Sequence, residues 1–457
     1  MPGPGLDLIK RIVVVMMENR SFDHLLGYLS LPPLNWSVDG LQNDPAWITK
    51  ASSVYNGGVY PPFPLTDPYH VMPADPPHEW YNIARQMGPP SNGIYPMNGF
   101  VENYANAKEK PPVKPGDSPP VMGYFTGQYI PITDFFAKNF AVCDHWFSSL
   151  PAGTQANRLM AMAGYSQIAV NQFPLPRQDL VYDWLTAHGV RWRVYHEDLP
   201  FFAMMLEWLP DILHGTHFRP FEQFFDDVQN EPPDEFPEVI FVEPTYTDAP
   251  HIGPGRDDHA PSAVQGGQKF LFEAYRDITL MPEIWEGTVM IVTYDEHGGF
   301  FDHISPPQIP TDPPRGANYS RGFATLGVRV PAMIISPFVE AKSVFNGTLD
   351  HTSVLKLIAQ KFDRGQSYSR AVDSRPVGGV LDVLNLSAAR TDIPSAPTLG
   401  DYLAPAAGYV PGTLPPSPLG EGFKRALDEI RDHPANTNGK FDNLLKAFPP
   451  EPPMRTA

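Results

Sequence analysis

The sequence predicts an α/β fold built on a mostly parallel central sheet with helices on both faces. Short apolar runs rich in β-branched residues alternate along the 457 residues with segments of helical periodicity, which is the order expected for a parallel sheet. Two of these runs, residues 12–17 and 288–294, pass directly into polar clusters. Open α/β sheets bind ligands at the carboxyl ends of their strands, so both clusters are candidate site residues.

The predicted elements follow one another in a regular order. Buried strands are expected at residues 12–17, 140–147, 190–195, 238–243, 288–294 and 330–336. Helices are expected at residues 154–163, 180–188, 266–279, 352–362 and 421–433. The segment 31–133 is rich in Pro, Gly, Tyr and Asn and is too long for a plain loop, so we expect a lid-like insertion over the site.

The strand at 288–294 is followed by two adjacent carboxylates, Asp295 and Glu296, and one residue later by Gly298 and Gly299. Two carboxylates at the end of a buried strand repel each other unless a cation or protons balance them. The glycines let the backbone turn sharply and approach a ligand closely. Hard anionic oxygens on a tight turn suit a divalent metal. The alternative is a solvated acidic turn with incidental histidines.

The strand at 12–17 runs directly into Glu18 and Asn19. A carboxylate and an amide are two oxygen ligands, and they stand where open sheets bind ligands. A helix start is the alternative explanation, because Asn and Ser followed by Asp also begin helices.

A third segment places Thr154 after a Pro/Gly turn and before a helix-forming run. Capping the helix is the commoner role for such a threonine. The same geometry also suits catalysis, because a helix N-terminus binds phosphate and its positive end favours an alkoxide. With a metal on its oxygen, Thr154 could attack phosphorus as a nucleophile.

Together these three motifs resemble one family. Glu-Asn-Arg-Ser-Phe-Asp-His at 18–24, Gly-Thr-x-x-Asn-Arg at 153–158 and Asp-Glu-His-Gly-Gly-x-x-Asp-His at 295–303 are similar to the bacterial phosphoesterases that include phospholipases C and acid phosphatase A. That family is a branch of the alkaline phosphatase superfamily, so the resemblance implies an alkaline phosphatase-like fold. It runs from about residue 8 to 362, and Ala156 replaces a proline that many relatives have.

The resemblance implies one divalent metal ion (Mg, Mn, Ca or Zn) and a phosphate-ester substrate, including phospholipid. Thr154 matches the nucleophile, which is serine in the acid phosphatase branch and often threonine in the phospholipase C branch. The matching metal-binding positions are Glu18, Asn19, Thr154, Asp295 and Glu296.

Three histidines match those that line the phosphoryl pocket in the family. His78 matches by its Asp…His-x-Trp context, and His259 is our preferred acid for the leaving group. His217 matches the first of two adjacent histidines, although Phe218 replaces the second. Taken singly, each is explained as well by a structural role, since the chain has 14 histidines.

Other polar residues rank lower as site residues. His297 and His303 are expected to orient the two carboxylates without a direct role. Residues after His351 make good helix caps. A two-metal site would need a second ligand cluster, for which the obvious source is Asp257, Asp258, His259 and His351.

The resemblance places a catalytic domain at residues 1–370, with the insertion at about 31–133, and a Pro-rich C-terminal wrap or cap at 371–457. The insertion's aromatic residues either hold an apolar leaving group or form the insertion's own small core. They are Trp36, Tyr60, Trp80, Tyr81, Tyr95, Phe100, Tyr124, Phe125 and Tyr129.

Composition narrows the range of partners. A net charge of −18 argues against nucleic acid and against simple electrostatic binding to anionic membranes. No stretch approaches the roughly 20 apolar residues that span a bilayer. Cys143 is the only cysteine, so compartment cannot be inferred from disulfides. The chain as written is expected to be cytoplasmic, or periplasmic or secreted if a signal was removed, and its oligomeric state is open.

We therefore predict a metal-dependent phosphoric ester hydrolase that works through a phosphothreonine intermediate. The substrate is either a phospholipase C-like diester, favoured by Thr154 and Phe218, or an acid phosphatase-like monoester, favoured by the short chain. The alternative is a catalytically inactive relative that binds phosphorylated ligands or a partner. A sulfatase is disfavoured because the Cys/Ser-x-Pro-x-Arg pattern is absent around Thr154.

Overall fold

The computed structural model of the chain describes residues 3–69, 71–363, 367–400 and 417–450. Its centre is an eight-stranded sheet of order β13-β6-β12-β11-β1-β10-β8-β9. Seven strands run in one direction and only β12 runs against its neighbours, so the mostly parallel sheet is confirmed. In sheet order the strands are Ser343–Phe345, Ala141–Cys143, Ala332–Ile335, Thr288–Tyr294, Arg11–Met17, Val239–Glu243, Trp192–His196 and Phe218–Pro220.

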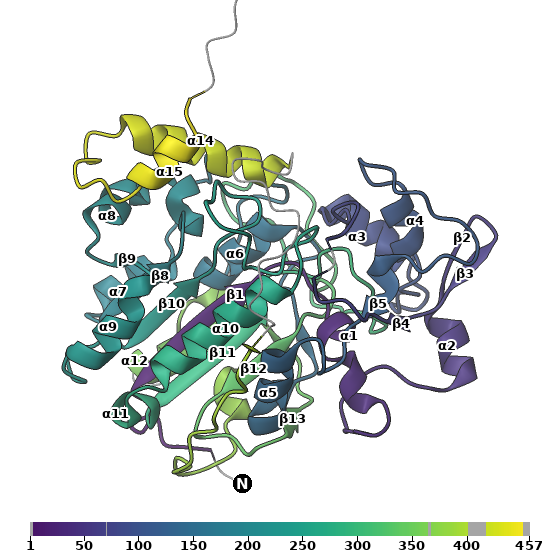
Figure 1. Ribbon diagram of the computed structural model, residues 1–457, viewed down its shortest axis with the longest axis horizontal. Coiled ribbons are helices and arrows are strands. Elements are labelled where there is room, and N and C mark those ends of the chain that lie inside the picture. The colour runs from purple at the N-terminus through teal and green to yellow at the C-terminus, as the bar shows by residue number, and fades with distance from the viewer. Residues whose placement is uncertain (1–2, 70, 364–366, 401–416, 451–457) are drawn as a thin grey trace, which may run out of the picture.

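Helices cover both faces of this sheet, as predicted (Figure 1). One layer contains α5 (Pro131–Asn139), α9 (Glu222–Asn230) and α10 (Gln265–Ile278), which lie against one another. The other contains α6 (Thr154–Ala163), α7 (Val181–Ala187) and α12 (Thr352–Phe362). The shorter helices are α8 (Leu209–His214), α11 (Pro282–Trp285), η3 (Phe201–Met204) and η4 (Leu206–Trp208). None of the helices in the described ranges is long and apolar enough to cross a bilayer.

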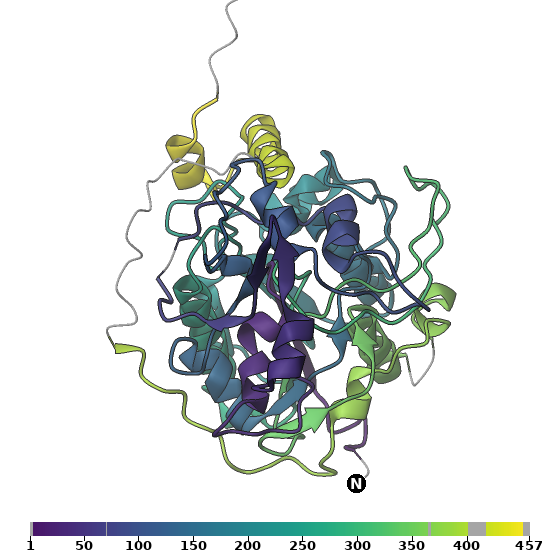
Figure 2. The same ribbon diagram turned by 90° about the vertical axis from the view of Figure 1, so that its right-hand side faces the viewer.

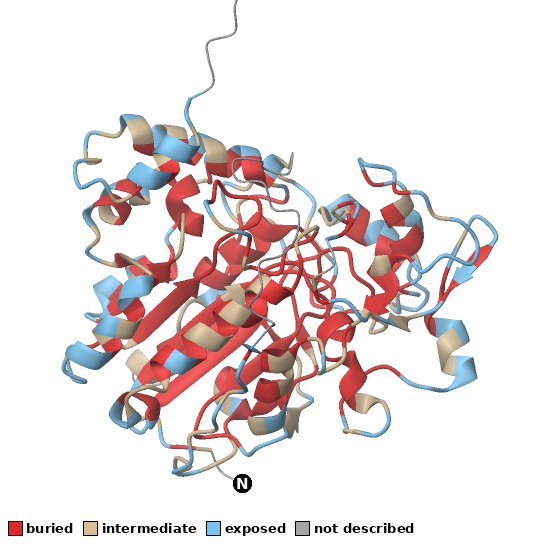
Figure 3. Ribbon diagram, in the orientation of Figure 1, coloured by how far each residue is buried: buried red, intermediate tan, exposed pale blue. Residues whose placement is uncertain are grey.

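The two central strands bring the first and third motifs together. β1 and β11 pair in parallel over their full length, from Arg11 beside Thr288 to Met17 beside Tyr294. Apart from Met16, every residue of both strands is buried, which accounts for their unbroken apolar sequence (Figure 3). Because the strands end side by side, the residues that follow them emerge at the same edge of the sheet.

One predicted strand differs from the structure. The run 140–147 forms two strands, β6 and β7 (Trp146–Phe147), and β7 pairs with β14 (Leu349–Asp350) instead of extending the central sheet. The break lies at buried Asp144, whose carboxylate accepts from the Asp39 N–H and the Asn346 amide, both at other parts of the chain. Satisfying this acid redirects the backbone.

The segment 31–133 forms a layer beside the sheet that includes helices α2 (Pro45–Ala51), α3 (Trp80–Met87) and α4 (Phe100–Ala105) (Figures 1 and 2). Tyr60 and Phe100 are buried in a second hydrophobic core within it. Its strands and 3-10 turn are β2 (Ser53–Tyr55), β3 (Gly58–Tyr60), β4 (Phe63–Pro64), β5 (Gly123–Tyr124) and η2 (Pro120–Met122). Before it, the chain forms α1 (Phe22–Leu25) and η1 (Gly27–Ser30).

The C-terminal part contains α13 (Arg370–Asp373), η5 (Val380–Val383), α14 (Pro418–Asp432) and α15 (Asp442–Ala447). The helix expected at 421–433 is α14, which packs on η3 beside the sheet. Residues 401–416 and 451–457 of the predicted wrap lie outside the described residues.

A buried charge cluster ties the first and third motifs to the rest of the fold. Arg329 is fully buried and pairs with Asp23 (3.1 Å) and Asp302 (3.2 Å). His303 donates from Nδ1 to Asp23 at 2.6 Å and lies 3.3 Å from Asp39. The arginine supplies the positive charge that these carboxylates need, so the Asp302-His303 pair is structural and does not orient Asp295 or Glu296.

His303 should make stability depend on pH. Burial alone lowers the pKa of His303, but Asp23, aided by Asp39, outweighs it and raises the value from 6.5 to about 9. The charged imidazole therefore stabilises the fold fully below pH 6.5, and this contribution is lost as pH rises through 9. The shift corresponds to roughly 3 kcal/mol.

We expect His303→Gln to be less stable than the parent protein at pH 6, by up to roughly 3 kcal/mol. The difference should shrink by pH 9.5, because the imidazole is then neutral. Denaturant unfolding of both proteins at the two pH values measures this. A destabilisation of the same size at both would show that packing, not charge, is what His303 contributes.

Candidate active site

The site forms where β1 and β11 end. The Asn19 N–H donates to Asp295 Oδ1 at 3.1 Å, which joins the first motif to the third. Asn19 has a φ of +62°, and Gly298 has the same positive value. A Cβ at Gly298 would collide with the Asn19 backbone, so only glycine permits this close approach. The two-glycine turn therefore brings Glu18–Asn19 and Asp295–Glu296 together.

Thr154 reaches the same place from α6. It is the first residue of the helix, and the N-cap is Gly153, which has no side chain to cap with. The Thr154 hydroxyl instead donates to Asn19 Oδ1 at 3.5 Å and is fully buried. Capping is thus not the role of this threonine. The structure brings the three motifs to one point.

Asn157 explains part of the middle motif. Its amide donates to the carbonyl oxygens of Leu150 (3.1 Å) and Ala152 (2.7 Å), and its oxygen accepts from the Leu150 N–H (2.9 Å). These bonds hold the turn that leads into α6. The position of Thr154 is therefore set by a buried side chain within its own helix.

Arg158 is a site residue that sequence analysis missed. Its guanidinium lies 3.0 Å from Glu18 Oε1 and 3.7 Å from Asp295 Oδ2. It is held between the rings of Phe201 and Tyr246, whose centroids are 4.6 and 5.0 Å away. Its position four residues after Thr154, on the same helix face, was the available signal.

The buried carboxylates are incompletely satisfied. Among the described residues, the Glu18 carboxylate has the ion pair with Arg158 but accepts no hydrogen bond, and neither Asp295 Oδ2 nor Glu296 Oε1 accepts one, although all are buried. Burial raises the pKa of each group. Repulsion from neighbouring carboxylates raises the pKa of Glu18 and Asp295 further, against the attraction of Arg158, whereas the charge of His78 opposes the rise for Glu296. The Arg158 guanidinium and the His78 imidazole, whose pKa is raised to about 10, leave one negative charge on the three carboxylates uncompensated. This oxygen donor set therefore fits a divalent cation.

Two neutral histidines support these carboxylates. His351 donates from Nε2 to the Asp295 carbonyl (2.7 Å) and accepts at Nδ1 from the Trp146 indole (3.3 Å). His297 lies 3.3 Å from Glu296 and 2.8 Å from Gln86 of α3. Burial lowers the pKa of His351 to about 4 and of His297 to about 3. The expected orienting role thus fits His297 and also His351.

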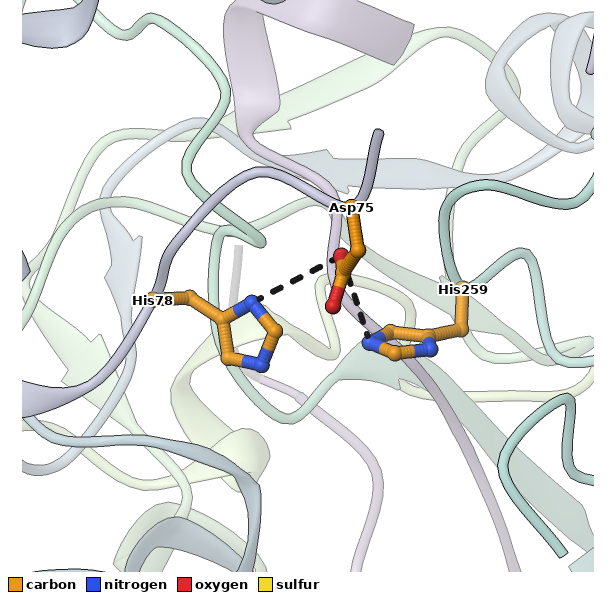
Figure 4. A group of neighbouring side chains, drawn as sticks. All are labelled: Asp75, His78 and His259. Atoms are coloured by element: carbon orange, nitrogen blue, oxygen red, sulfur yellow. Dashed lines mark ion pairs between the residues drawn. The ribbon is translucent and has the colours of Figure 1, made fainter. Parts of the chain in front are cut away.

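His78 and His259 face each other across Asp75 (Figure 4). Asp75 Oδ1 lies 3.9 Å from His78 Nδ1 and from His259 Nε2, and Asp248 Oδ2 lies 3.7 Å from His259 Nδ1. His78 Nε2 is 3.4 Å from the Asn19 amide, so this row of groups begins beside Thr154. Asp248 follows β10, and the rule that sites form at strand ends was the signal that would have found it.

The charges in this row follow from burial and neighbours. Burial lowers the pKa of His78, but Glu296, Asp75 and Glu79 outweigh it and raise the value to about 10. Burial and the nearby His78 charge hold the pKa of His259 well below 6.5. Burial raises the pKa of Asp75 to about 7 and of Asp248 to about 8. Protons are therefore held in this row near neutral pH.

His217 does not reach the cluster and is withdrawn as a site residue. It precedes β9, which lies three strands from β1, or about 14 Å at about 4.8 Å per strand. Its ring stacks on Trp192 at 4.0 Å and its Nδ1 bonds Asp211 at 2.7 Å. The position of His217 just before Arg219-Pro220-Phe221, which matches the family, was weak evidence that this histidine belongs to the site.

Two of the residues predicted to supply a second ligand cluster, Asp257 and Asp258, are hydrogen-bonded to neighbouring protein groups. Asp257 accepts from the Thr247 backbone and hydroxyl (2.6 and 2.7 Å) and from the His259 N–H (3.0 Å). Asp258 accepts from the Tyr294 hydroxyl at 2.6 Å. Asp75, His78 and His259, however, have ligand atoms within 4.8 Å of one another, which suits a metal ion as well as a proton relay.

Fold and site together define an α/β protein with a buried oxygen-rich cation site and a threonine hydroxyl beside it. The chain belongs to the phosphoesterase family, whose model matches residues 9–364. It is similar to non-specific phospholipase C4 of Arabidopsis thaliana, with 33% identity over 368 residues, 76% of this chain and 65% of that protein. The chain thus spans about two thirds of that relative.

Other relatives align over more of their length. Non-specific phospholipase C3 of Arabidopsis thaliana is 33% identical over 424 residues, 86% of this chain and 76% of that protein. Phospholipase C B of Mycobacterium tuberculosis (strain H37Rv) is 29% identical over 490 aligned positions, 93% of this chain and 87% of that protein.

Solved structures align more weakly. A phosphonate monoester hydrolase from Silicibacter pomeroyi is 12% identical with a TM-score of 0.32, over 58% of this chain and 73% of that one. A protein in the alkaline phosphatase superfamily from Vibrio parahaemolyticus is 12% identical with a TM-score of 0.32, over 55% and 63%. The family assignment rests on the sequence.

Removing one buried carboxylate should stabilise the metal-free protein. At pH 8 we expect Glu296→Gln to raise the free energy of unfolding by on the order of 1 to 3 kcal/mol, because an uncompensated charge is lost. Mn²⁺ should raise the melting temperature of the parent protein and have a smaller effect on the variant. Thermal unfolding of chelator-treated protein, with and without Mn²⁺, measures both effects.

Glu340→Gln is the matched control, because Glu340 is exposed and lies away from the site. It should leave both melting temperatures unchanged. A parent protein that none of Mg²⁺, Mn²⁺, Ca²⁺ and Zn²⁺ stabilises would contradict the assignment of a cation site.

Proposed function

We propose that the protein hydrolyses phosphoric esters in a metal-dependent reaction through a phosphothreonine intermediate, with phospholipase C-like diesters as its substrates. One observation carries the proposal. The Thr154 hydroxyl takes no part in capping α6 and instead bonds Asn19, whose backbone N–H bonds the Asp295 carboxylate. A buried hydroxyl beside a cation site is the arrangement that a metal-activated nucleophile needs.

The residues divide the chemistry between them. One divalent ion held by Glu18, Asn19, Thr154, Asp295 and Glu296 would polarise a phosphoryl oxygen and favour the Thr154 alkoxide. Thr154 Oγ1 forms a bond to phosphorus as the bond from phosphorus to the leaving alcohol breaks. Water then cleaves the bond from Thr154 to phosphorus, which still carries the head group of a diester, and this restores the Thr154 hydroxyl and releases the phosphorylated head group.

His78, with its raised pKa and its position beside Asn19, is placed to donate to phosphoryl oxygens. His259 remains the proposed acid for the leaving alkoxide. It lies between Asp75 and Asp248, and the raised pKa of both acids lets them hold the proton that His259 passes on.

The preference for diesters is supported by the relatives, which are named phospholipases C. The position of His217, far from the cluster, leaves the site without the histidine pair of the acid phosphatase branch. Both points favour a phospholipase C-like substrate over a monoester.

Thr154→Ala should abolish turnover while keeping the fold. We expect kcat for nitrophenyl phosphorylcholine to fall by at least about 10³-fold, because the nucleophile is lost. Thr154→Ser is the matched control and should retain activity, because it keeps a hydroxyl in the same place. Parent enzyme that is acid-quenched during turnover of nitrophenyl phosphorylcholine should carry a phosphorylcholine group on Thr154, detectable by mass spectrometry.

Equal activity in Thr154→Ala would remove the covalent mechanism. An inactive parent protein with every divalent ion tested, on both nitrophenyl phosphorylcholine and nitrophenyl phosphate, would contradict the proposed hydrolysis itself.

A further inference from the structure

A groove of about 910 Å³ lies beside the Thr154 turn. One wall is α3 of the insertion, and the opposite wall is the segment 319–325, which precedes the strand β12. Its lining includes Trp80 and Met87 from the first wall, Tyr319 and Phe323 from the second, and Pro151 between them. This volume is within the range of about 300 to 1,000 Å³ that ligand pockets occupy.

Two of the residues that line the groove lie close in the chain to residues of the phosphoryl site. Pro151 stands three residues before Thr154, and Trp80 stands two residues after His78. The backbone that links them is in contact, because a Cβ on Gly153 would lie 3.5 Å from the His78 carbonyl oxygen and from Glu79 Oε2. The groove therefore adjoins the turn that carries Thr154, so one substituent of a phosphorus atom at Thr154 can extend into it.

The lining is mostly apolar, and its charged side chains, Asp312 and Arg321, are both exposed. Trp80 is 46% exposed, although burying an aromatic of this size is strongly favourable. Apart from Asp312 and Arg321, the described residues that line the groove are uncharged, so most of its surface does not match a charged head group or a phosphate. It matches a long uncharged hydrocarbon.

We propose that this groove binds the acyl chains of the glyceride that leaves when a glycerophospholipid is cleaved at Thr154. The inference rests on the proposed function and specifies the leaving-group side of the substrate. The phosphorylated head group then occupies the opposite side, near His78 and Asn19. Trp80 and Ala84, which both face the groove from α3, set the preference for acyl chains.

Short-chain phosphatidylcholines below their micelle concentrations test this, because soluble substrates remove any effect of lipid surfaces. In the parent enzyme kcat/KM should rise from dibutyroyl to dihexanoyl phosphatidylcholine, by up to about fourfold for each methylene buried. Nitrophenyl phosphorylcholine, which has no acyl chain, provides the reference. Trp80→Ala and the groove-filling Ala84→Trp should each reduce the dihexanoyl/dibutyroyl ratio by about tenfold.

Neighbours on α3 that do not line the groove give matched controls. Tyr81 is 48% exposed, and Tyr81→Ala removes an aromatic as exposed as Trp80. Arg85→Trp introduces the same indole as Ala84→Trp on an exposed position outside the groove. Both should keep the chain-length ratio of the parent. The proposal would be overturned if the parent showed no increase in kcat/KM from dibutyroyl to dihexanoyl phosphatidylcholine. It would also be overturned if Trp80→Ala and Ala84→Trp kept the dihexanoyl/dibutyroyl ratio of the parent.

Binding separates failure of the groove from failure of the proposed function. Dihexanoylglycerol titrated into the parent protein should bind and change tryptophan fluorescence, and Ala84→Trp should weaken this binding at least tenfold by calorimetry. Binding without turnover of any ester would support the groove and reject the function. Turnover of nitrophenyl phosphorylcholine without binding of dihexanoylglycerol would support the proposed function and reject the groove.

Discussion

The repulsion among three buried carboxylates is the constraint on which this site depends. Glu18, Asp295 and Glu296 emerge from two strands that end side by side, and Arg158 and His78 offset only part of their charge. Holding them together without water is costly. The fold meets that cost with the hydrogen bond from Asn19 to Asp295 and with packing around the guanidinium, which leaves a preorganised anionic site whose oxygens fit a divalent cation.

The third motif contains two acid–histidine pairs that the structure uses differently. Asp302 pairs with Arg329 and accepts the Asp23 and Ile304 N–H groups. Asp295 and Glu296 each retain a buried oxygen without a partner. The same residue types thus have a structural role where an arginine and N–H groups bond every carboxylate oxygen. Where carboxylate oxygens accept no hydrogen bond, they are candidates for holding a cation.

The site residues that directly follow a strand could be predicted from the sequence. Those whose position depends on packing between distant segments could not. The ends of β1 and β11 were predictable because continuous apolar runs stop at Glu18 and Asp295. Arg158 was not, because its partners come from segments far apart in the chain. The prediction that His217 belongs to the site was wrong because a local motif does not show where in the sheet the strand that follows it lies.

The insertion contacts both the carboxylate site and the groove. Its α3 carries Gln86, which binds His297 behind the carboxylates, and Trp80, which opens onto the groove. Crystallography of protein soaked with Mn²⁺, with anomalous scattering, tests the central claim most directly. We predict a peak in contact with Glu18, Asn19, Thr154, Asp295 and Glu296. Ordered Mn²⁺ that touches none of these side chains would contradict the account.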